Sequence, residues 1–204
     1  MLHDDPTPET LARLEQAEQL KLDGQYREAI AVLEELLLED PELVPALEEI
    51  ADNELSLQEY ERAETAAQRA VQLESESYTG YYILGFLRSQ EEAWDKAVEH
   101  LRRANALRPN NAEILRCLGW ALFHAGQRAQ GIVTLERALN LDADSPLTLC
   151  DLGVTYLETR DFPRAKALFQ RSIDLDPQNE RANECMQALK RLSLAPEQRV
   201  PQGH

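Results

Sequence analysis

The chain repeats its own pattern every 34 residues, and this period constrains the fold more than any other feature of the sequence. The count runs from Thr10 to Asn179 without an insertion or a deletion. Small residues mark two positions of the repeat, at Gly85, Gly119 and Gly153 and at Ala29, Ala63, Ala97, Gly131 and Ala165. A fixed period of this size is typical of stacked units, none of which can bury its apolar face alone. We therefore expect a single elongated domain whose function resides on the surface of the array.

Each unit is predicted to be two antiparallel helices joined by a tight turn. In residues 112–145, apolar residues recur at intervals of three and four, which is typical of one face of a helix. Gly126 interrupts this pattern where the end of a helix favours a positive φ, and a second apolar face follows. Ser145 and Pro146 then provide the N-cap and the first turn of the next helix. The small residues fall one on each helix, where they allow the two backbones to approach closely.

Three further positions complete the pattern. An aromatic residue begins the second helix at Tyr26, Tyr60, Trp94 and Phe162. A Leu-Gly pair lies in the first helix at 84–85, 118–119 and 152–153, and a proline closes the unit at Pro41, Pro109 and Pro177. On these residues the chain resembles the tetratricopeptide repeat family over residues 10–179. The resemblance implies an all-α fold, a right-handed α-solenoid of antiparallel helix pairs whose first helices line a concave groove, and a role as a protein-binding scaffold.

The repeat divides the chain into four parts. Residues 1–9 form a short N-terminal lead, and residues 10–179 form one solenoid domain with repeats at 10–43, 44–77, 78–111, 112–145 and 146–179. Residues 180–194 continue the pattern of a first helix without a second, so we expect a capping helix that hides the last interface of the array. Residues 195–204 have the composition of a disordered tail.

Two departures from the pattern carry structural predictions. Glu54 and Arg88 occupy equivalent positions of neighbouring repeats, where other repeats have leucine or tyrosine, so they are expected to form an ion pair. Arg128 and Gly131 replace the aromatic residue and the alanine of the fourth repeat. This repeat is therefore expected to be the softest of the five, unless the stem of Arg128 covers the same surface.

The charge of the chain is strongly asymmetric. The net charge is −16, and all of it lies in the first 77 residues, while the remainder is neutral. An acidic surface repels nucleic acid and anionic membranes, which argues against both as partners. The simplest role of this charge is to keep that end of the array soluble.

The composition also bears on location and on cofactors. No apolar run approaches the ~18 residues of a membrane-spanning helix, and the N-terminus has no features of a signal peptide, so we expect a cytoplasmic protein. The 3 cysteines show no Cys-x-x-Cys spacing and the 4 histidines lie far apart, so neither a metal site nor another cofactor is expected.

The first helices have a second face that should line the groove, and its composition changes along the chain. The centre is aromatic with one arginine, the N-terminal flank is acidic, and the C-terminal flank is apolar, as at Cys150 and Val154. The candidate partner-binding residues are Glu18, Glu48, Asp52, Tyr82, Phe86, Gln90, Arg116, Trp120, Phe123, His124 and Val154. An aromatic patch beside an arginine has the composition of an interface hot spot. The alternative is that neighbouring helices or the C-terminal tail cover this patch.

These residues predict a non-enzymatic adaptor or chaperone-like module that binds a peptide or helix of apolar and basic character. The alternative is a self-assembling oligomeric scaffold. Family members that grip an acidic C-terminal peptide use Lys, Arg and Asn in the groove. Here the matching positions hold Leu14, Glu18, Glu48, Asp52, Tyr82 and Phe86, so this clamp is absent.

Catalysis is not expected from the sequence. It contains neither a Gly-rich phosphate loop nor a nucleophile elbow. His124 and Cys150 both belong to the groove positions, but a pair of these two residues would lack an oxyanion donor and an orienting group.

Overall fold

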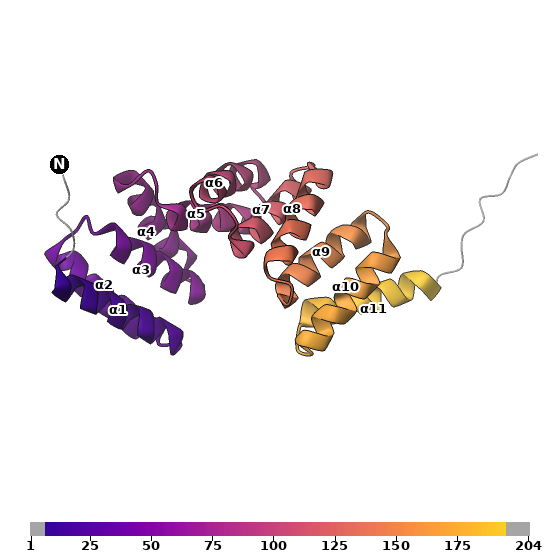
Figure 1. Cartoon of the computed structure of the whole chain (residues 1–204), viewed down its shortest axis with the longest axis horizontal. Coiled ribbons are helices and arrows are strands. Elements are labelled where there is room, and N and C mark those ends of the chain that lie inside the picture. Colours follow the sequence, from indigo (N-terminus) through magenta and orange to yellow (C-terminus); the bar gives the residue numbers. More distant parts are fainter. Residues whose placement is uncertain (1–6, 195–204) are drawn as a thin grey trace, which may run out of the picture.

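The computed structural model of the chain describes residues 7–194, with side chains over residues 7–191. This part of the chain contains eleven α-helices and no strand. They pair as α1 (Pro8–Leu22) with α2 (Tyr26–Glu39), α3 (Val44–Ser56) with α4 (Tyr60–Leu73), α5 (Tyr78–Gln90) with α6 (Trp94–Leu107), α7 (Ala112–His124) with α8 (Arg128–Leu141), and α9 (Pro146–Glu158) with α10 (Phe162–Leu175), followed by α11 (Glu180–Leu194). The predicted α-solenoid of antiparallel helix pairs is confirmed, and Figure 1 shows it as an arch. The predicted tail at 195–204 lies outside the described residues, and α1 begins inside the predicted N-terminal lead.

The turn inside each helix pair uses one residue with a positive φ. These residues lie 34 apart, at Gly24 (75°), Gln58 (61°), Glu92 (57°), Gly126 (85°) and Arg160 (65°). The conformation turns the next N–H back onto the helix, as where Gln127 N donates to Leu122 O over 2.9 Å. The prediction for Gly126 is confirmed. At Gln58, Glu92 and Arg160 a side chain makes this conformation cost about 1 kcal/mol each, so packing of the helix pair imposes the turn.

The small residues bring the two helices of a pair into close contact, as predicted. A Cβ at Gly119 would lie 2.9 Å from the carbonyl oxygen of Gly131, and a Cβ at Gly131 would lie 2.7 Å from the carbonyl oxygen of Gly119. In the neighbouring pair, a Cβ at Gly85 would meet the side chain of Leu101 at 2.5 Å. The backbones of α7 and α8 therefore touch directly, while other pairs fill the same space with a large side chain.

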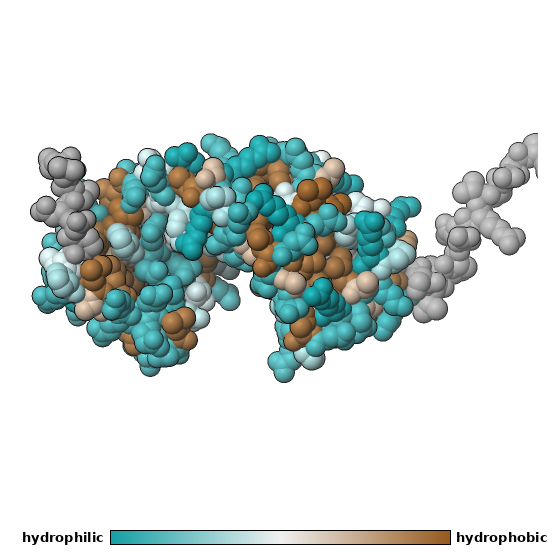
Figure 2. Space-filling view, in the orientation of Figure 1, coloured by the Kyte–Doolittle hydropathy of each residue, from teal (hydrophilic) through white to brown (hydrophobic). Residues whose placement is uncertain are grey.

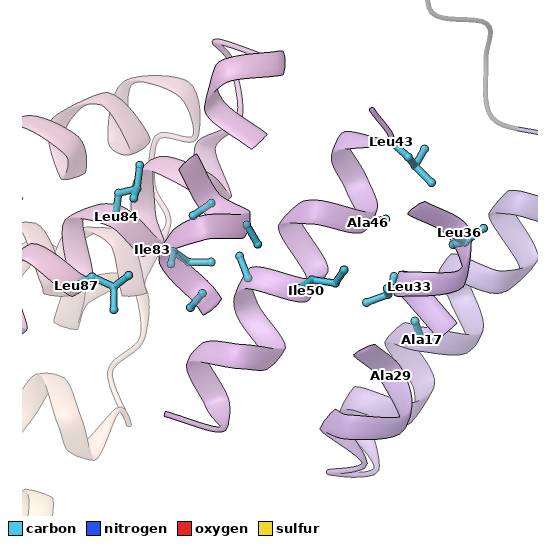
Figure 3. Close-up of a cluster of buried hydrophobic side chains, with 14 residues drawn as sticks. Ala17, Ala29, Leu33, Leu36, Leu43, Ala46, Ile50, Ile83, Leu84 and Leu87 are labelled. Atoms are coloured by element: carbon cyan, nitrogen blue, oxygen red, sulfur yellow. The ribbon is translucent and has the colours of Figure 1, made fainter. Parts of the chain in front are cut away.

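The buried apolar clusters are shared between neighbouring repeats. Figure 3 shows the N-terminal cluster, in which Ala17 of α1 and Leu33 of α2 face Ile50 of α3, and the cluster continues to Ile83 of α5. A fully buried leucine such as Leu33 stabilises the fold by about 2 kcal/mol relative to an exposed one. Because each repeat supplies one wall of its neighbour's core, no unit of the array has a complete core of its own.

The odd-numbered helices form the inner side of the arch. Each of them touches the next odd-numbered helix, from α1 to α11, whereas no two even-numbered helices touch within the described residues. Elements on the inside of a curve converge and those on the outside diverge, so the first helix of each pair lines the concave groove. Figure 2 shows the hollow beneath the middle of the arch.

The predicted ion pair between Glu54 and Arg88 is wrong. Arg62 Nε instead lies 2.9 Å from Glu54 Oε1, and Arg88 pairs with Glu64 and, at 2.8 Å, with Glu91. Side chains at this position of the repeat point toward the second helices rather than toward each other. Glu54 therefore meets α4 of its own repeat, and Arg88 meets α4 of the preceding repeat. No helix in the described part of the chain is long and apolar enough to cross a membrane.

Candidate partner-binding groove

A chain of polar side chains crosses the inner side of the array from α5 to α11. The Tyr82 hydroxyl donates to Glu113 Oε1 over 3.0 Å, and Arg116 donates to both carboxylate oxygens of Glu113 at 2.6 and 2.8 Å. Arg116 Nη1 also donates to Asp151 Oδ2 at 2.6 Å, and Arg181 Nη1 donates to Asp151 Oδ1 at 2.6 Å. These residues belong to α5, α7, α9 and α11. The polar network therefore ties four successive inner helices together.

Burial and pairing together set the charge states in this polar network. The Asp151 side chain is 3% exposed and the Arg116 side chain is 14% exposed. Burial alone would lower the pKa of Arg116, but its hydrogen bond to Glu113 and the surrounding negative charge raise this pKa above its ordinary value. Burial would raise the pKa of Glu113, but the hydrogen bonds from Arg116 and Tyr82 reverse the effect and lower it. Glu113 and Arg116 therefore stay ionised around neutral pH.

A central cavity of about 330 Å³ opens beside this network, between α5, α7, α9, α11 and the start of α6. The residues that line it are Phe86, Ser89, Gln90, Glu92, Trp94, Arg116, Cys117, Trp120, Asp151 and Arg181. The guanidinium carbon of Arg181 lies 4.5 Å from the centre of the Trp120 ring. On another side the Trp120 ring meets His124 edge-on, with ring centres 4.2 Å apart, and His124 stacks on Trp94 at 4.8 Å. The central cavity therefore combines aromatic surface with the paired charges of Arg116, Asp151 and Arg181.

An acidic cavity of about 210 Å³ lies nearer the N-terminal end, between α1, α3, α5 and α7. Lys21 Nζ contacts Glu49 Oε2 at 2.6 Å and Asp52 Oδ2 at 3.2 Å inside it. Burial works to lower the pKa of Lys21, but Glu49 and Asp52 raise it above its ordinary value. Glu113 also lines this cavity but is neutralised by Arg116, so the two carboxylates of Glu49 and Asp52 face one ammonium group and the cavity is net negative.

The structure brings together part of the predicted site. Six of the predicted residues line the two cavities, namely Phe86, Gln90, Arg116 and Trp120 in the central cavity and Asp52 and Tyr82 in the acidic cavity. Glu113 connects the two groups, because it lines the acidic cavity and binds Arg116 of the central one. The aromatic and acidic parts of the groove are therefore contiguous.

Four other predicted residues lie outside these two cavities. Glu18 is exposed on α1, and Val154 is half-buried against the C-terminal part of the core. Glu48 is half-buried and accepts a hydrogen bond from Ser77 Oγ at 2.6 Å, and burial raises its pKa. His124 is half-buried against Trp120, and burial lowers its pKa. Glu48 is therefore used to hold the start of α5 rather than to present a free carboxylate.

Phe123 does not face the groove, and the expectation that it does is wrong. Its side chain is 2% exposed. A Cβ at Gly131 would come within 2.8 Å of the Phe123 Cβ, so α8 passes directly over this residue, and the Arg128 guanidinium lies 5.4 Å from the ring centre. Phe123 and Arg128 together thus replace the aromatic residue missing from the fourth repeat. Cys150, expected in the apolar flank of the groove, is likewise buried, at 2% exposure.

Six residues of the central cavity are absent from the sequence-based set, and three of them, Asp151, Arg181 and Trp94, make the contacts described above. Asp151 occupies a repeat position that holds Ile83 and Cys117 in the two preceding repeats. A carboxylate at a position that is apolar in those two repeats is the sequence feature by which Asp151 could have been found. Arg181 would be found by extending the groove columns into the capping helix. Trp94 belongs to the aromatic residues that begin the second helices. Because these residues recur in the repeat, they are expected to stabilise the fold rather than to bind a partner.

Models of the tetratricopeptide repeat match residues 14–78, 48–112, 89–149 and 148–179 of the chain. The chain belongs to the tetratricopeptide repeat family. Anaphase-promoting complex subunit 3 of Schizosaccharomyces pombe is 28% identical to this tetratricopeptide repeat protein over 90 residues, which are 44% of this chain and 14% of that relative. The Hsp70-Hsp90 organizing protein of Triticum aestivum is 26% identical over 110 residues, 54% of this chain and 19% of that relative. The chain thus spans less than a fifth of either relative.

Solved tetratricopeptide repeat structures share its fold. The APC/C hetero-tetramer Cut9-Hcn1 matches with a TM-score of 0.80 and 19% identity, over 91% of this chain and 37% of that one. TTC0263 of Thermus thermophilus matches with a TM-score of 0.69 and 21% identity, over 88% and 98%. YrrB, described as having an unusual peptide-binding site, matches with a TM-score of 0.63 and 20% identity, over 86% and 90%. At these identities the likeness establishes the fold, and the family supports a role as a protein–protein interaction module.

Proposed function

We propose that this chain is a non-enzymatic adaptor or chaperone-like module that holds a peptide or helix of apolar and basic character in its concave groove. The observation that carries the proposal is the central cavity, where Phe86 and Trp120 expose part of their rings beside charges fixed by the polar network. Aromatic residues at the centre of a concave surface are typical anchors for a bound side chain.

The walls of the central cavity, which include the apolar ring of Phe86, are held in place by the protein itself. Phe86 packs from its other side against the core, so its position is fixed before a ligand arrives. Arg116 is held by Glu113 and Asp151, so the polar wall is also rigid. A rigid surface loses little conformational entropy when a partner binds, which favours affinity.

The basic character of the ligand follows from the neighbouring acidic cavity. Glu49 and Asp52 leave a net negative charge there after pairing with Lys21, because one ammonium group faces two carboxylates. A ligand that places an apolar side chain against Phe86 can therefore place a basic one toward α1 and α3. Charge complementarity of this kind accelerates association and weakens as salt screens it.

The relatives support the same class of function. One is a subunit of a protein complex, and the other is named for organizing two chaperones. Both names describe proteins that associate with other proteins, which is the class of activity we propose for this groove.

The proposal is tested by selecting peptides from a random 12-residue phage library on the immobilised chain and titrating the selected peptides in solution. We expect the selected peptides to combine aromatic or aliphatic residues with Arg or Lys. Trp120→Ala removes an anchor and Gln90→Arg places a positive charge at the rim, so each should weaken binding by about tenfold or more.

Gln130→Arg is the matched control, because Gln130 is exposed on α8 on the outer side of the array. It adds the same charge and should leave the affinity unchanged. Equal binding by wild type, Trp120→Ala and Gln90→Arg would refute the groove as the binding site. Sedimentation at increasing concentration tests the alternative, because a self-assembling scaffold would form oligomers that Gln90→Arg does not disrupt.

A further inference from the structure

Arg181 of the capping helix occupies a position that a ligand's basic side chain would take. Its guanidinium carbon lies 4.5 Å from the centre of the Trp120 ring, and its Nη1 donates to Asp151 Oδ1 at 2.6 Å. An aromatic face and a buried carboxylate are the two groups that bind a guanidinium most strongly. Both belong to inner helices, α7 and α9, whereas Arg181 reaches them from α11.

The two arginines that bind Asp151 differ in how firmly they are held. Arg116 is 14% exposed and is also bound bidentately by Glu113, so it is a fixed part of the cavity wall. Arg181 is 47% exposed and contacts Asp151 through one nitrogen. Solvent and salt compete for a half-exposed guanidinium, so Arg181 exchanges for another cation more easily than Arg116 does. Arg181 is therefore the group that can leave while the rest of the site stays intact.

Departure of Arg181 would leave an unusually favourable place for another cation. The Asp151 side chain is 3% exposed, so its Oδ1 would lose a charged partner in a site with little water. A buried carboxylate oxygen without a partner is costly, so the vacancy favours refilling by a group of the same kind. The Trp120 ring face would be uncovered at the same moment.

We propose that the Trp120 ring and Asp151 Oδ1 form a binding subsite for an arginine side chain of the partner, and that Arg181 fills this subsite in the free protein. The inference rests on the proposed function and adds to it the residue type that the partner presents at the centre of the groove. The planar guanidinium satisfies both groups at once, stacking on the indole while donating to the carboxylate. A lysine ammonium cannot stack in this way.

The internal arginine also sets the apparent affinity of the subsite. A site that is open for only a fraction of the time binds its ligand more weakly by that fraction. If Arg181 fills the subsite about nine-tenths of the time, removal of its charge should strengthen binding of an added arginine about tenfold. Arg181 thus raises the intrinsic affinity that a partner needs to occupy the subsite, by the same factor for every cation.

The experiment uses N-acetyl-arginine methylamide as the probe and follows the Trp120 indole N–H by NMR. The chain has 2 tryptophans, so two indole signals are expected, and the Trp120→Phe variant assigns them. The full-length chain is compared with Arg181→Gln, which removes the charge but keeps most of the stem. We expect the Arg181→Gln variant to bind the probe about tenfold more tightly than wild type, with the largest shift at Trp120.

Four controls decide the outcome. N-acetyl-citrulline methylamide, which has the same shape without the charge, and N-acetyl-lysine methylamide should both bind Arg181→Gln much more weakly than the arginine probe. The double variant Arg181→Gln with Trp120→Ala should lose the gain. Arg191→Gln, on the exposed side of the same helix, should behave as wild type. Backbone amide shifts of α11 check that Arg181→Gln leaves the helix docked, and Arg181→Lys serves as the second variant if it does not.

Equal binding of the arginine probe by wild type and Arg181→Gln would overturn the proposal, as would equal binding of arginine and lysine. Tighter binding of N-acetyl-glutamate methylamide to wild type than of the arginine probe would also overturn it, because the cavity would then select anions. Failure of this inference differs from failure of the proposed function. Selected peptides would still depend on Trp120 and Gln90 in the first case, and no groove-dependent peptide would exist in the second.

Discussion

Arg62 of α4 holds its Nε 2.9 Å from Oε1 of Glu54, whose side chain is 1% exposed. The two groups form an ion pair, but their geometry is not that of a hydrogen bond. Neither carboxylate oxygen of Glu54 is hydrogen-bonded to any residue that the structure describes. Burial raises the pKa of Glu54, and the charge of Arg62 offsets this only in part. The second repeat thus carries a buried carboxylate where the first, fourth and fifth repeats carry leucine or tyrosine.

Glu54→Gln is expected to stabilise the protein at pH 7 by about 1 kcal/mol, because it removes the desolvation of a buried charge. A urea titration followed by circular dichroism gives the free energy of unfolding. The control is Glu76→Gln at an exposed site between α4 and α5, which removes the same charge and should leave the stability nearly unchanged. A Glu54→Gln variant less stable than wild type at pH 7 would show that Arg62 more than compensates the burial.

The same carboxylate predicts a pH dependence with a definite sign. A group whose pKa is raised in the folded state binds its proton more tightly when folded, so its contribution is fully present below its unfolded pKa and is lost as the pH rises through the folded pKa. The stability advantage of Glu54→Gln over wild type should therefore shrink as the pH falls from 7 toward 4. An advantage that grows over this range would contradict the raised pKa.

Gly119→Ala is expected to destabilise the array by about 2 kcal/mol, although alanine favours helix. The added Cβ would lie 2.9 Å from the Gly131 carbonyl oxygen, and a backbone carbonyl cannot turn aside as a side chain can. Hydrogen exchange measured by mass spectrometry should show the faster opening in α7 and α8 first. Gln130→Ala, at an exposed site of α8, gives the same helix preference without the contact and should be neutral or slightly stabilising.

The fold could be predicted from the sequence because repetition multiplies each weak local signal. One glycine at the end of a helix is ambiguous, but the positive-φ turn recurs at the same place in five repeats. The sequence therefore predicts the position of the turn even at Arg160, where the residue itself disfavours it. Sequence positions that recur in every repeat correspond to contacts that all repeats share. These are contacts of the backbone and the core.

The candidate site was predictable only in part, because side-chain partners in a groove come from neighbouring repeats. Phe123 and Trp120 are both aromatic and lie on the same helix. Phe123 is nevertheless buried beneath α8, where Gly131 leaves room for it, whereas Trp120 stays partly exposed. Asp151 and Arg181 meet across 30 residues of sequence, and although a carboxylate at position 151 departs from the two preceding repeats, the sequence does not name its partner. The angular position of a residue on its own helix does not tell whether a neighbouring helix covers its side chain.

Lys21→Met is expected to strengthen binding of basic peptides selected on the groove by a few-fold, because Glu49 and Asp52 would lose their common cation. The gain should fall as salt rises, since the added attraction is electrostatic. Titration calorimetry at two salt concentrations measures both effects. Lys166→Met, at an exposed site on α10, makes the same substitution away from the groove and should leave the affinity unchanged. A peptide that binds Lys21→Met more weakly than wild type would show that Lys21 contacts the ligand directly.

The three cysteines are expected to react with iodoacetamide in the order of their access to solvent. Cys117 and Cys150 are 5% and 2% exposed, and burial raises the pKa of Cys150 to about 12, whereas Cys185 on α11 is half-buried. Because the thiolate is the reactive form, the first two should alkylate only after local opening, and Cys185 should alkylate first. Mass spectrometry of tryptic peptides over a time course measures the order, and in urea all three should react at similar rates. Faster reaction at Cys117 than at Cys185 in the native protein would mean that the centre of the array opens before its C-terminal end.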